Sequence, residues 1–246
     1  ATSVLDPMAG SGDLLAACAP ALRHGMPLWG IDVDPVIAET CAKNVPRASV
    51  IGGSAFDADS LRALPQIAWS RVLTNPPYVR YQSLAKSGEE SAIVPSAIEV
   101  RTHLIEALGA CEALDDDDKA LFRTLAARYS GLSDLAVPSV ILCAALTAQD
   151  GVLGLVMPEA WLTRDYAIPV HYLLARWFQI EAVVEDAHAA WFDNALVRTT
   201  LVVARRVQRR TSTLAEMAHS GYPHVRLSGA ASDATSLVAR RYKGLE

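Results

Sequence analysis

The sequence lacks the paired cysteines of a disulfide scaffold or a zinc site. Its four cysteines, Cys18, Cys41, Cys111 and Cys143, are widely spaced and form no CxxC pair. Such single cysteines are typical of buried free thiols in a reducing compartment. We therefore expect neither disulfides nor a bound metal, and we expect the protein to be cytoplasmic.

Long apolar runs are also missing. The longest, residues 135–148, is shorter than the roughly 20 residues that a membrane-spanning helix needs, and it contains Pro138. We interpret it as a buried core helix and expect no membrane partner. No secretory signal opens the chain. Because it begins without Met and directly before a strand-like segment, we interpret it as a fragment of a longer protein or a processed one.

A basic excess is absent as well. The 22 Lys and Arg residues are outnumbered by 27 Asp and Glu residues, which leaves a net charge of −5. Any nucleic-acid-binding surface must therefore be local or lie on another domain. What the chain does have is apolar content, 51% of its 246 residues. This predicts one large, well-cored domain, with or without an elaboration.

The first motif is a glycine-rich turn between a predicted strand, residues 4–5, and a predicted helix, residues 14–24. The turn contains Gly10 and Gly12. Glycines let the backbone come close to a ligand, and the new helix presents its free amide groups there. Leu15 stands where the dinucleotide fingerprint has its third glycine, so a nicotinamide oxidoreductase is disfavoured.

A second predicted strand, residues 28–32, ends in Asp32. Nucleotide-binding α/β folds place an acid here, about 20 residues beyond the glycines, to accept hydrogen bonds from ribose hydroxyls. Asp34 and Pro35 follow, a pair that is typical of a helix N-cap and first turn. We therefore interpret Asp32 as a ribose ligand and Asp34 as a cap.

Two more strands are predicted at residues 48–51 and 71–74. The first leads into the loop 52–57, which would face the same sheet edge as the glycine turn and flank an adenine ring. The second stops at residues 75–78, where two prolines end it. Successive strand–helix units with site-like residues at the carboxyl ends of their strands predict a doubly wound, mostly parallel α/β sheet.

Residues Asn75, Pro76, Pro77 and Tyr78 form the motif around which the chain is organised. The Asn75 amide oxygen and the Pro76 carbonyl place two acceptors side by side, because Pro77 keeps Pro76 extended. Two such acceptors suit an exocyclic amino group, and the Tyr78 ring offers a planar base a stacking surface. Taken alone, the four residues fit a proline-rich turn with an aromatic plug equally well.

In this order, the motifs resemble those of class I S-adenosylmethionine-dependent methyltransferases of the Asn-Pro-Pro-Tyr type. The sequence is most similar to the gamma group of N6-adenine DNA methyltransferases of restriction–modification and phage-defence systems. The resemblance covers most of residues 1–206 and implies a seven-stranded, Rossmann-like sheet. The matching segments are residues 6–12, 30–35, 75–81, 133–135, 151–158, 191–192 and 195–205.

The resemblance also implies cofactor-binding residues. It places Asp6, Pro7, Gly10 and Gly12 around the methionine part of S-adenosylmethionine, and Asp32 on the ribose hydroxyls. Asn75 is expected to border the cofactor as well as the target amine. We expect no metal ion to take part.

On the substrate side, the resemblance implies that Asn75 and Pro76 hold the target amino group and align it with the cofactor's methyl carbon. Tyr78 would stack on the flipped base, and Phe192 would pack against its other face. Arg80, next to Tyr78 in the chain, is a candidate phosphate contact.

One position departs from the family pattern. The family usually has an acid after the glycine of the third-strand motif, which binds the adenine amino group of the cofactor. Here that position is Ser54, followed by Ala55, with Asp57 further on. Because Ser54 can accept a hydrogen bond, we expect Ser54 and Ala55 to border the cofactor's adenine.

Residues 1–210 are predicted to form the catalytic domain, and residues 211–246 a linker or the start of a further domain. A helical insertion at residues 82–130 is either a DNA-facing lid, with Arg80 and Lys86 near phosphates, or a structural excursion.

The remaining features lie between residues 115 and 210, and some of them have both a structural and a functional interpretation. The acidic run 115–118 predicts a solvated turn or a helix start. His188 is interpreted as a surface histidine in a loop. A helix is predicted at residues 167–178, and strands are predicted at residues 152–157, 180–184 and 196–204. Four arginines at the end of the last strand are either solvated or in contact with phosphates: Arg205, Arg206, Arg209 and Arg210.

The resulting hypothesis is methyl transfer from S-adenosylmethionine to the N6 amine of an adenine flipped out of DNA. The same motif can serve N4-cytosine, an RNA base amine or a glutamine side-chain amide. A catalytically silent methyltransferase-like scaffold in a defence complex is an alternative of another class. The expected partners are DNA and recognition or nuclease domains or subunits outside this chain.

Overall fold

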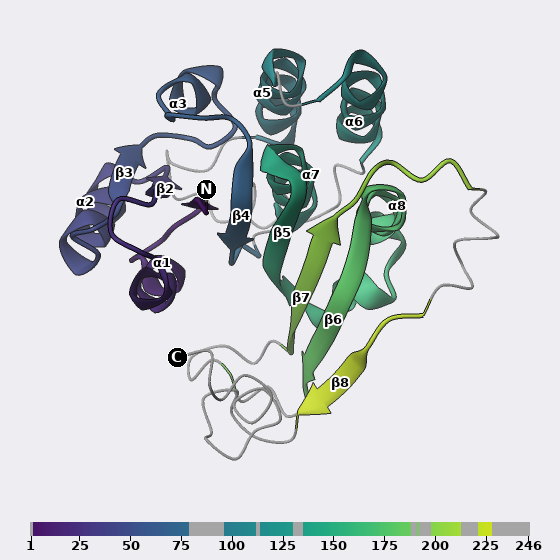
Figure 1. The fold of residues 1–246 in the computed structure, drawn as a ribbon. Coiled ribbons are helices and arrows are strands. Elements are labelled where there is room, and N and C mark those ends of the chain that lie inside the picture. Colours follow the sequence, from purple (N-terminus) through teal and green to yellow (C-terminus); the bar gives the residue numbers. More distant parts are fainter. Residues whose placement is uncertain are drawn as a thin grey trace, which may run out of the picture.

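A computed structural model describes residues 2–78, 96–111, 114–129, 135–187, 191, 198–212 and 221–227. Its strands are β1 Val4–Asp6, β2 Leu28–Asp32, β3 Ser49–Gly52, β4 Trp69–Thr74, β5 Thr147–Pro158, β6 Phe178–Asp186, β7 Thr199–Arg206 and β8 His224–Leu227. They form one sheet in the order β3-β2-β1-β4-β5-β7-β6-β8 (Figure 1). The described sheet thus has eight strands where seven were expected.

The helices alternate with the first strands and then cluster in the middle of the chain. The α-helices are α1 Asp13–Cys18, α2 Pro35–Asn44, α3 Ala58–Arg62, α5 Ala97–Ala110, α6 Asp116–Arg128, α7 Ala136–Leu146 and α8 Ile168–Trp177. The 3-10 helices are η1 Ala19–Ala21, η2 Glu159–Leu162 and η3 Asp165–Ala167. The first helix is shorter than predicted, since α1 gives way to η1 where Pro20 lacks an amide donor.

Strand direction divides the sheet. Strands β3, β2, β1, β4 and β5 are mutually parallel, β7 is antiparallel to both β5 and β6, and β8 is parallel to β6. All strands except β7 therefore end at the same edge, which we call the carboxyl edge. The order of the chain reverses between β1 and β4, and such switch points are where open α/β sheets bind ligands.

Side chains alternate between two cores, one on each face of the sheet. Val4 of β1 packs with Leu15 and Cys41 of the helices α1 and α2. Its neighbour Leu5 belongs to the larger core that contains residues of α3, α5, α6, α7 and α8. Period-2 alternation of this kind is what a strand buried on both faces requires. The predicted doubly wound architecture is confirmed.

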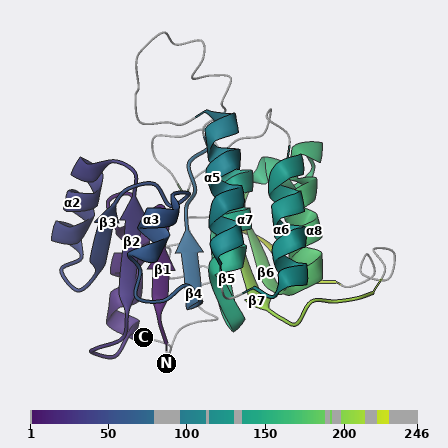
Figure 2. The ribbon, with the colours of Figure 1, turned by 90° about the horizontal axis from the view of Figure 1, so that it is seen from above.

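The predicted core helix is α7, and all eleven of its residues are buried. Helices α5 and α6 lie side by side and cover α7, which Figures 1 and 2 show between them and the sheet. Within the described ranges, no helix combines the length and the apolar character that crossing a bilayer requires. None of the four cysteines forms a disulfide bond.

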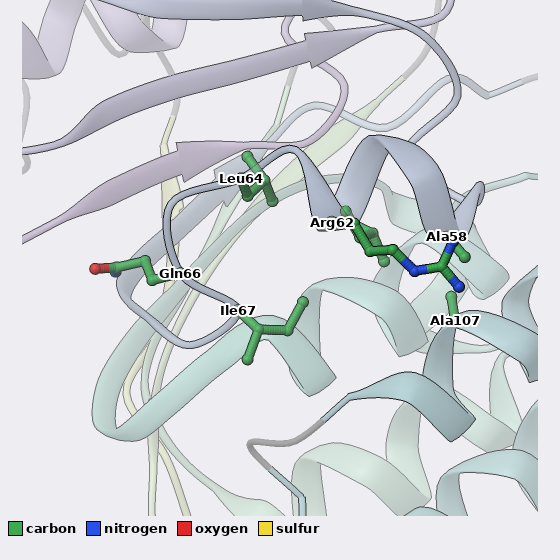
Figure 3. A pocket seen from close by; sticks show the side chains of 7 residues that line it. Ala58, Arg62, Leu64, Gln66, Ile67 and Ala107 are labelled. Atoms are coloured by element: carbon green, nitrogen blue, oxygen red, sulfur yellow. The ribbon is translucent and has the colours of Figure 1, made fainter.

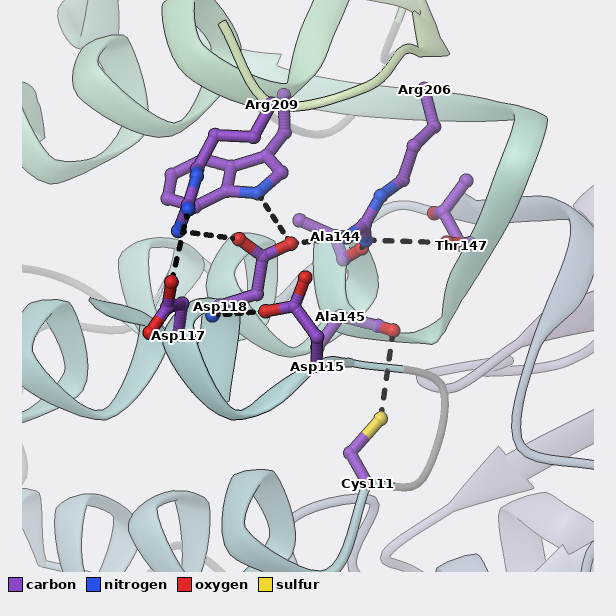
Figure 4. A network of polar contacts seen from close by, with 10 residues as sticks. Cys111, Asp115, Asp117, Asp118, Ala144, Ala145, Thr147, Arg206 and Arg209 are labelled. Carbon is purple, nitrogen blue, oxygen red and sulfur yellow. Dashed lines mark hydrogen bonds and ion pairs between the residues drawn. The ribbon is translucent and has the colours of Figure 1, made fainter. Parts of the chain in front are cut away.

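The acidic run begins α6, as one of its two interpretations predicts. Asp115 caps the helix by accepting a hydrogen bond from the Asp118 amide at 2.7 Å. Asp118 itself is not solvated: its side chain is buried and accepts a hydrogen bond from Trp177 Nε1 at 2.9 Å. Figure 4 shows this carboxylate beside Arg209, with Arg206 nearby.

The basic end lies at the edge of the sheet opposite Asn75, because β7 runs antiparallel to its neighbours. Arg206 is buried and donates to the Ala144 carbonyl at 2.6 Å, while Arg209 pairs with Asp118 at 2.9 Å (Figure 4). Arg205 pairs with Glu181 at 2.7 Å. The remaining arginine, Arg210, donates to the carbonyls of Ala175 and Phe178. These arginines therefore hold the fold together.

Strand β8 lies in the range 211–246, for which a linker or the start of a further domain was expected. It extends the sheet at the edge of β6, with Glu185 opposite Arg226 and Asp186 opposite Leu227. At least this part of the range thus belongs to the sheet (Figure 1).

Candidate functional site at the carboxyl edge

The candidate site lies where β1, β2 and β4 end. Because these strands are parallel neighbours, their last residues, Asp6, Asp32 and Thr74, reach the same edge of the sheet. Asn75 follows Thr74 directly. The structure thus brings the predicted catalytic motif to the edge where the glycine turn and both predicted cofactor-binding acids lie.

The glycine turn needs the conformations that its two glycines adopt. Gly10 has φ +51° and Gly12 has φ +94°, in the left-handed region that favours glycine. A Cβ at Gly12 would lie 2.9 Å from both Cys41 Sγ and Val45 Cγ2, so this glycine lets the start of α1 pack against α2. A Cβ at Gly10 would have no neighbour within 4 Å. The turn therefore has open space at Gly10, where a ligand can approach the backbone.

Asp32 ties the turn to the second strand. Its Oδ2 accepts a hydrogen bond from the Gly10 amide at 2.9 Å, and its Oδ1 accepts one from the Asp34 amide at 3.0 Å. The carboxylate is half-buried and each oxygen has a further acceptor position, so it can still receive hydroxyl donors. Asp34 is a helix cap, as predicted, and accepts hydrogen bonds from the Val36 and Ile37 amides.

Asp6 is the buried acid of the site, with 1% of its surface exposed. Its Oδ1 accepts a hydrogen bond from the Met8 amide at 3.1 Å. Burial raises the pKa of Asp6 to about 7, the Met8 amide and the Thr74 hydroxyl act against this, and the charge of Asp32 adds to it. Asp6 is therefore a carboxyl group that changes its charge near neutral pH.

The loop after β3 engages its polar groups internally. The Ser54 hydroxyl accepts a hydrogen bond from the Phe56 amide at 3.2 Å, and Ala55 is buried. The Asp57 carboxylate pairs with His103 Nδ1 of α5 at 2.9 Å. Ser54 and Asp57 are the two candidates for the adenine-binding position at which the resembled family has an acid. Asp57 is paired with His103 of the helical insertion, whereas the Ser54 hydroxyl can still donate its proton.

In the predicted catalytic motif, Asn75 is exposed and Pro76 is buried, while Pro77 and Tyr78 are half-buried. The Tyr78 hydroxyl donates a hydrogen bond to the Val156 carbonyl of β5 at 2.9 Å, and the ring packs on the larger core. This anchor was not predicted, and it fixes the ring beside the end of β5.

Four of the sequence-based assignments lie outside the described residues: Arg80, Lys86, His188 and Phe192. Close to the last of these, the Trp191 amide donates a hydrogen bond to Asp186 Oδ2 at 2.8 Å. The position of Asp186, at the carboxyl end of β6, is the signal by which this contact could have been found.

A pocket outside the site lies between α3, α5 and the segment before β4 (Figure 3). Its volume is about 330 Å³, and it contains none of the predicted site residues. Gln66 and Ile67 place it toward the amino end of β4, away from the carboxyl edge. The described residues contain no group of three or more His, Cys, Asp or Glu side chains that could hold a metal ion.

No protein-family model matches the sequence. Solved structures with a similar fold include a putative class I S-adenosylmethionine-dependent methyltransferase from Listeria monocytogenes. It is 13% identical, with a TM-score of 0.61, and the match covers 100% of this chain and 64% of that one.

Two further similar structures are a methyltransferase subunit and a restriction endonuclease. One is the methyltransferase subunit of a type I system from Streptococcus thermophilus, at 18% identity and a TM-score of 0.57, covering 85% of this chain and 40% of that one. The other is the type IIG restriction endonuclease BpuSI, also at 18% identity and a TM-score of 0.57, covering 85% and 23%. The chain therefore has the class I methyltransferase fold, and it spans less than two thirds of each of these longer chains.

Proposed function

We propose that this chain transfers a methyl group from S-adenosylmethionine to the exocyclic N6 amine of an adenine flipped out of DNA. The observation that carries the proposal is the position of Asn75. It follows strand β4 at the carboxyl edge, directly after Thr74, and the neighbouring strand β1 ends at the same edge in the buried Asp6. A motif for holding an amino group thus lies beside a turn that is open to a ligand.

The residues present fit the cofactor. Gly10 leaves room for a ligand at the turn, and Asp32 retains acceptor capacity for ribose hydroxyls. Asp6 and Pro7 border the same turn, where a carboxylate would favour a cationic ligand. Bound S-adenosylmethionine would supply an electrophilic methyl group on a sulfonium ion.

For the cofactor's adenine, we propose that Ser54 and Ala55 form one border. Because the Ser54 oxygen already accepts the Phe56 amide, its hydroxyl proton is the group best placed to serve a ring nitrogen. Gly12 lets α1 start close to the turn, so that the first amides of the helix face the ligand.

The chemical step depends on positioning. The N6 nitrogen is a weak nucleophile because its lone pair is delocalised into the ring. Acceptors at Asn75 Oδ1 and the Pro76 carbonyl would bind its two hydrogens and favour a tetrahedral nitrogen aligned with the methyl carbon. The nitrogen–carbon bond forms as the sulfur–carbon bond breaks, and the nitrogen then loses one proton to solvent.

The base must leave the duplex to reach this edge. We propose that Tyr78, fixed by its bond to the Val156 carbonyl, stacks on one face of the flipped adenine, and that Phe192 packs on the other. Arg80 is proposed to contact a phosphate. Residues 1–210 would form the catalytic domain with its insertion at 82–130.

The structural relatives suggest a context. Because two of them are parts of restriction–modification enzymes, we propose that this chain works with DNA-recognition or nuclease domains or subunits and serves phage defence.

The experiment is to separate cofactor binding from transfer. Calorimetry measures the affinity for S-adenosylmethionine, and transfer of a labelled methyl group to adenine-containing DNA measures activity. Asn75→Ala should lower transfer about a hundredfold or more, the typical effect of removing one preorganised polar group, while the cofactor still binds. Asn75→Asp, which keeps an acceptor oxygen, should retain measurable transfer.

The controls distinguish the alternatives. Duplexes without adenine and a matched RNA test for N4-cytosine and RNA-base methylation. A wild-type chain that binds the cofactor but methylates none of these would be a scaffold. Loss of cofactor binding in Asn75→Ala would contradict the proposed division of roles.

A further inference from the structure

A second pocket lies at the carboxyl edge, on the far side of β5 from the glycine turn. Its volume is about 630 Å³, within the range of small-molecule sites. It is lined by the 3-10 helix η2 after β5, the end of β6 and the edge strand β8. The pocket begins at Glu159, three residues beyond Val156, whose carbonyl holds Tyr78. It therefore lies on the same edge as the proposed base-binding residues.

A buried carboxylate, Glu185, lines the pocket and is held by two neighbouring side chains. Glu185 is 5% exposed, and each of its oxygens binds a different side chain of β8. Oε1 lies 2.8 Å from His224 Nε2, and Oε2 accepts a hydrogen bond from Arg226 Nε at 2.7 Å. Since Arg226 uses only Nε here, both of its terminal NH₂ groups are without a partner among the described residues. Glu185 thus holds the Arg226 guanidinium group in place through Nε and leaves its two terminal nitrogens available to a ligand.

A second cation lines the pocket from the other side. The Arg164 side chain is exposed, and no carboxylate in the described part of the chain pairs with it. The other acid of the pocket, Glu159, is paired at the rim with Arg198 at 3.8 Å. In a chain with a net charge of −5, two arginines therefore converge on one pocket whose carboxylates are already engaged. Such arginine groups match phosphate geometry.

An aromatic surface completes the pocket. Tyr222 is one of the few exposed large apolar side chains of the described chain, at 39%. Its ring centroid lies 6.3 Å from that of His224, with 33° between the ring planes. Exposed aromatic rings beside cationic side chains are typical of surfaces that bind unpaired or frayed nucleotides.

We infer that this pocket binds one nucleotide of the DNA next to the target base, with its phosphate on Arg164 and Arg226 and its base against Tyr222. This rests on the proposed function and extends it, since it assigns a second contact to the strand that the flipped base leaves. A bound phosphate here would hold the backbone on the opposite side of β5 from the cofactor turn and so oppose closure of the duplex.

The test is the affinity for a labelled adenine-containing DNA duplex at several salt concentrations, measured by fluorescence anisotropy with the full chain. Arg164→Ala should weaken binding several-fold and reduce the slope of log affinity against log salt by about 1. Arg226→Lys should do the same, because lysine can keep the ion pair with Glu185 but has no second nitrogen for a phosphate. Tyr222→Ala should weaken binding about tenfold with an unchanged slope, and Tyr222→Phe should bind like the wild type.

Arg62→Ala is the matched control, since it removes one exposed arginine of the other pocket (Figure 3). If Arg164→Ala, Arg226→Lys and Tyr222→Ala all bind DNA as this control does, the inference is overturned. It is equally overturned if polyglutamate displaces the duplex and Tyr222→Ala has no effect, which would indicate an acidic protein partner.

The outcomes separate this inference from the proposed function. A wild type that methylates DNA with variants that bind normally would refute the pocket alone. A wild type that binds DNA through these side chains but transfers no methyl group would refute the proposed activity and leave the pocket assignment intact.

Discussion

Asp6, a proposed cofactor-binding residue, has a carboxyl group that is costly to ionise in the folded protein. It ends strand β1 and is almost completely buried, and its pKa is raised to about 7, chiefly by desolvation. In the unfolded chain, this carboxyl would titrate near 3.8. Between these two values the unfolded state has lost its proton while the native state keeps it. The free energy of unfolding therefore falls as the pH rises through this interval. The stabilisation from the protonated Asp6 is fully present only below the pKa of the unfolded chain.

Asp6→Asn should remove this dependence, because asparagine does not titrate. The wild type should lose stability relative to Asp6→Asn as the pH rises from about 4 to about 7, by on the order of 1 kcal/mol per pH unit. Above pH 7 the difference should stay constant. The measurement is the free energy of unfolding by urea at pH 5, 6, 7 and 8.

The control is Asp59→Asn, which changes a carboxyl that is 94% exposed. Its stability should run parallel to that of the wild type over the whole pH range. Parallel curves for Asp6→Asn as well would mean that Asp6 titrates normally in the folded protein.

Among the elements, the insertion helix α6 and the end of β7 depend on one carboxylate. Asp118 accepts a hydrogen bond from Trp177, pairs with Arg209 at 2.9 Å and lies 3.7 Å from the buried Arg206 (Figure 4). Burial lowers the pKa of Arg206, and the charge of Asp118 opposes this shift. The network thus joins three elements that are far apart in the sequence.

Removing this carboxylate should release α6. We expect Asp118→Ala to cost about 3–5 kcal/mol of unfolding free energy, because a buried guanidinium group loses its counter-charge. Hydrogen exchange of the α6 amides should become faster than that of the β5 amides. Asp117→Ala is the matched control: its carboxylate is 84% exposed, and the expected cost is at most about 1 kcal/mol. Equal losses of unfolding free energy in the two variants would show that the Asp118 network does not hold α6 in place.

The interpretation of α6 also shows the reach of a sequence pattern. Four successive acids predict a helix start because a cap acts within one turn, and Asp115 is that cap. The pattern cannot tell which of the four acids is buried. That choice depends on Trp177, 59 residues away along the chain.

At the scale of the whole molecule, β8 pairs with β6 and forms the last strand of the sheet. The Val183 amide donates to the Pro223 carbonyl, and the Ala187 amide donates to the Leu227 carbonyl, both at 2.9 Å. Glu185 adds its two bonds to His224 and Arg226; although burial acts to raise its pKa, these partners lower it overall. The edge strand therefore contributes both backbone and charged contacts.

A chain that ends at Ser212 should be less stable than one that ends at Leu227. It loses the β8 hydrogen bonds and both ion pairs, for about 1–3 kcal/mol, and it exposes β6 as a free edge that favours association. Thermal unfolding and light scattering of the two truncated chains would measure this. Identical melting temperatures would mean that residues 213–227 act only as a linker.

The sequence by itself determined the order of the first four strands, the glycine turn, the Asp34 cap and the buried character of α7. These features depend on propensity, capping and apolar pattern, which act over a few neighbouring residues. The position of Asn75, Asp6 and Asp32 at one edge of the sheet also followed, since parallel strands that end in polar residues share that edge.

The tertiary structure alone decided the rest. It made β7 antiparallel, so that the arginines at its end bind groups within the protein. It also added β8 to the sheet, raised the pKa of Asp6 and placed Arg164 and Arg226 around one pocket. Each of these depends on burial and on partners distant in the sequence, and a desolvation energy has no local signature in the chain.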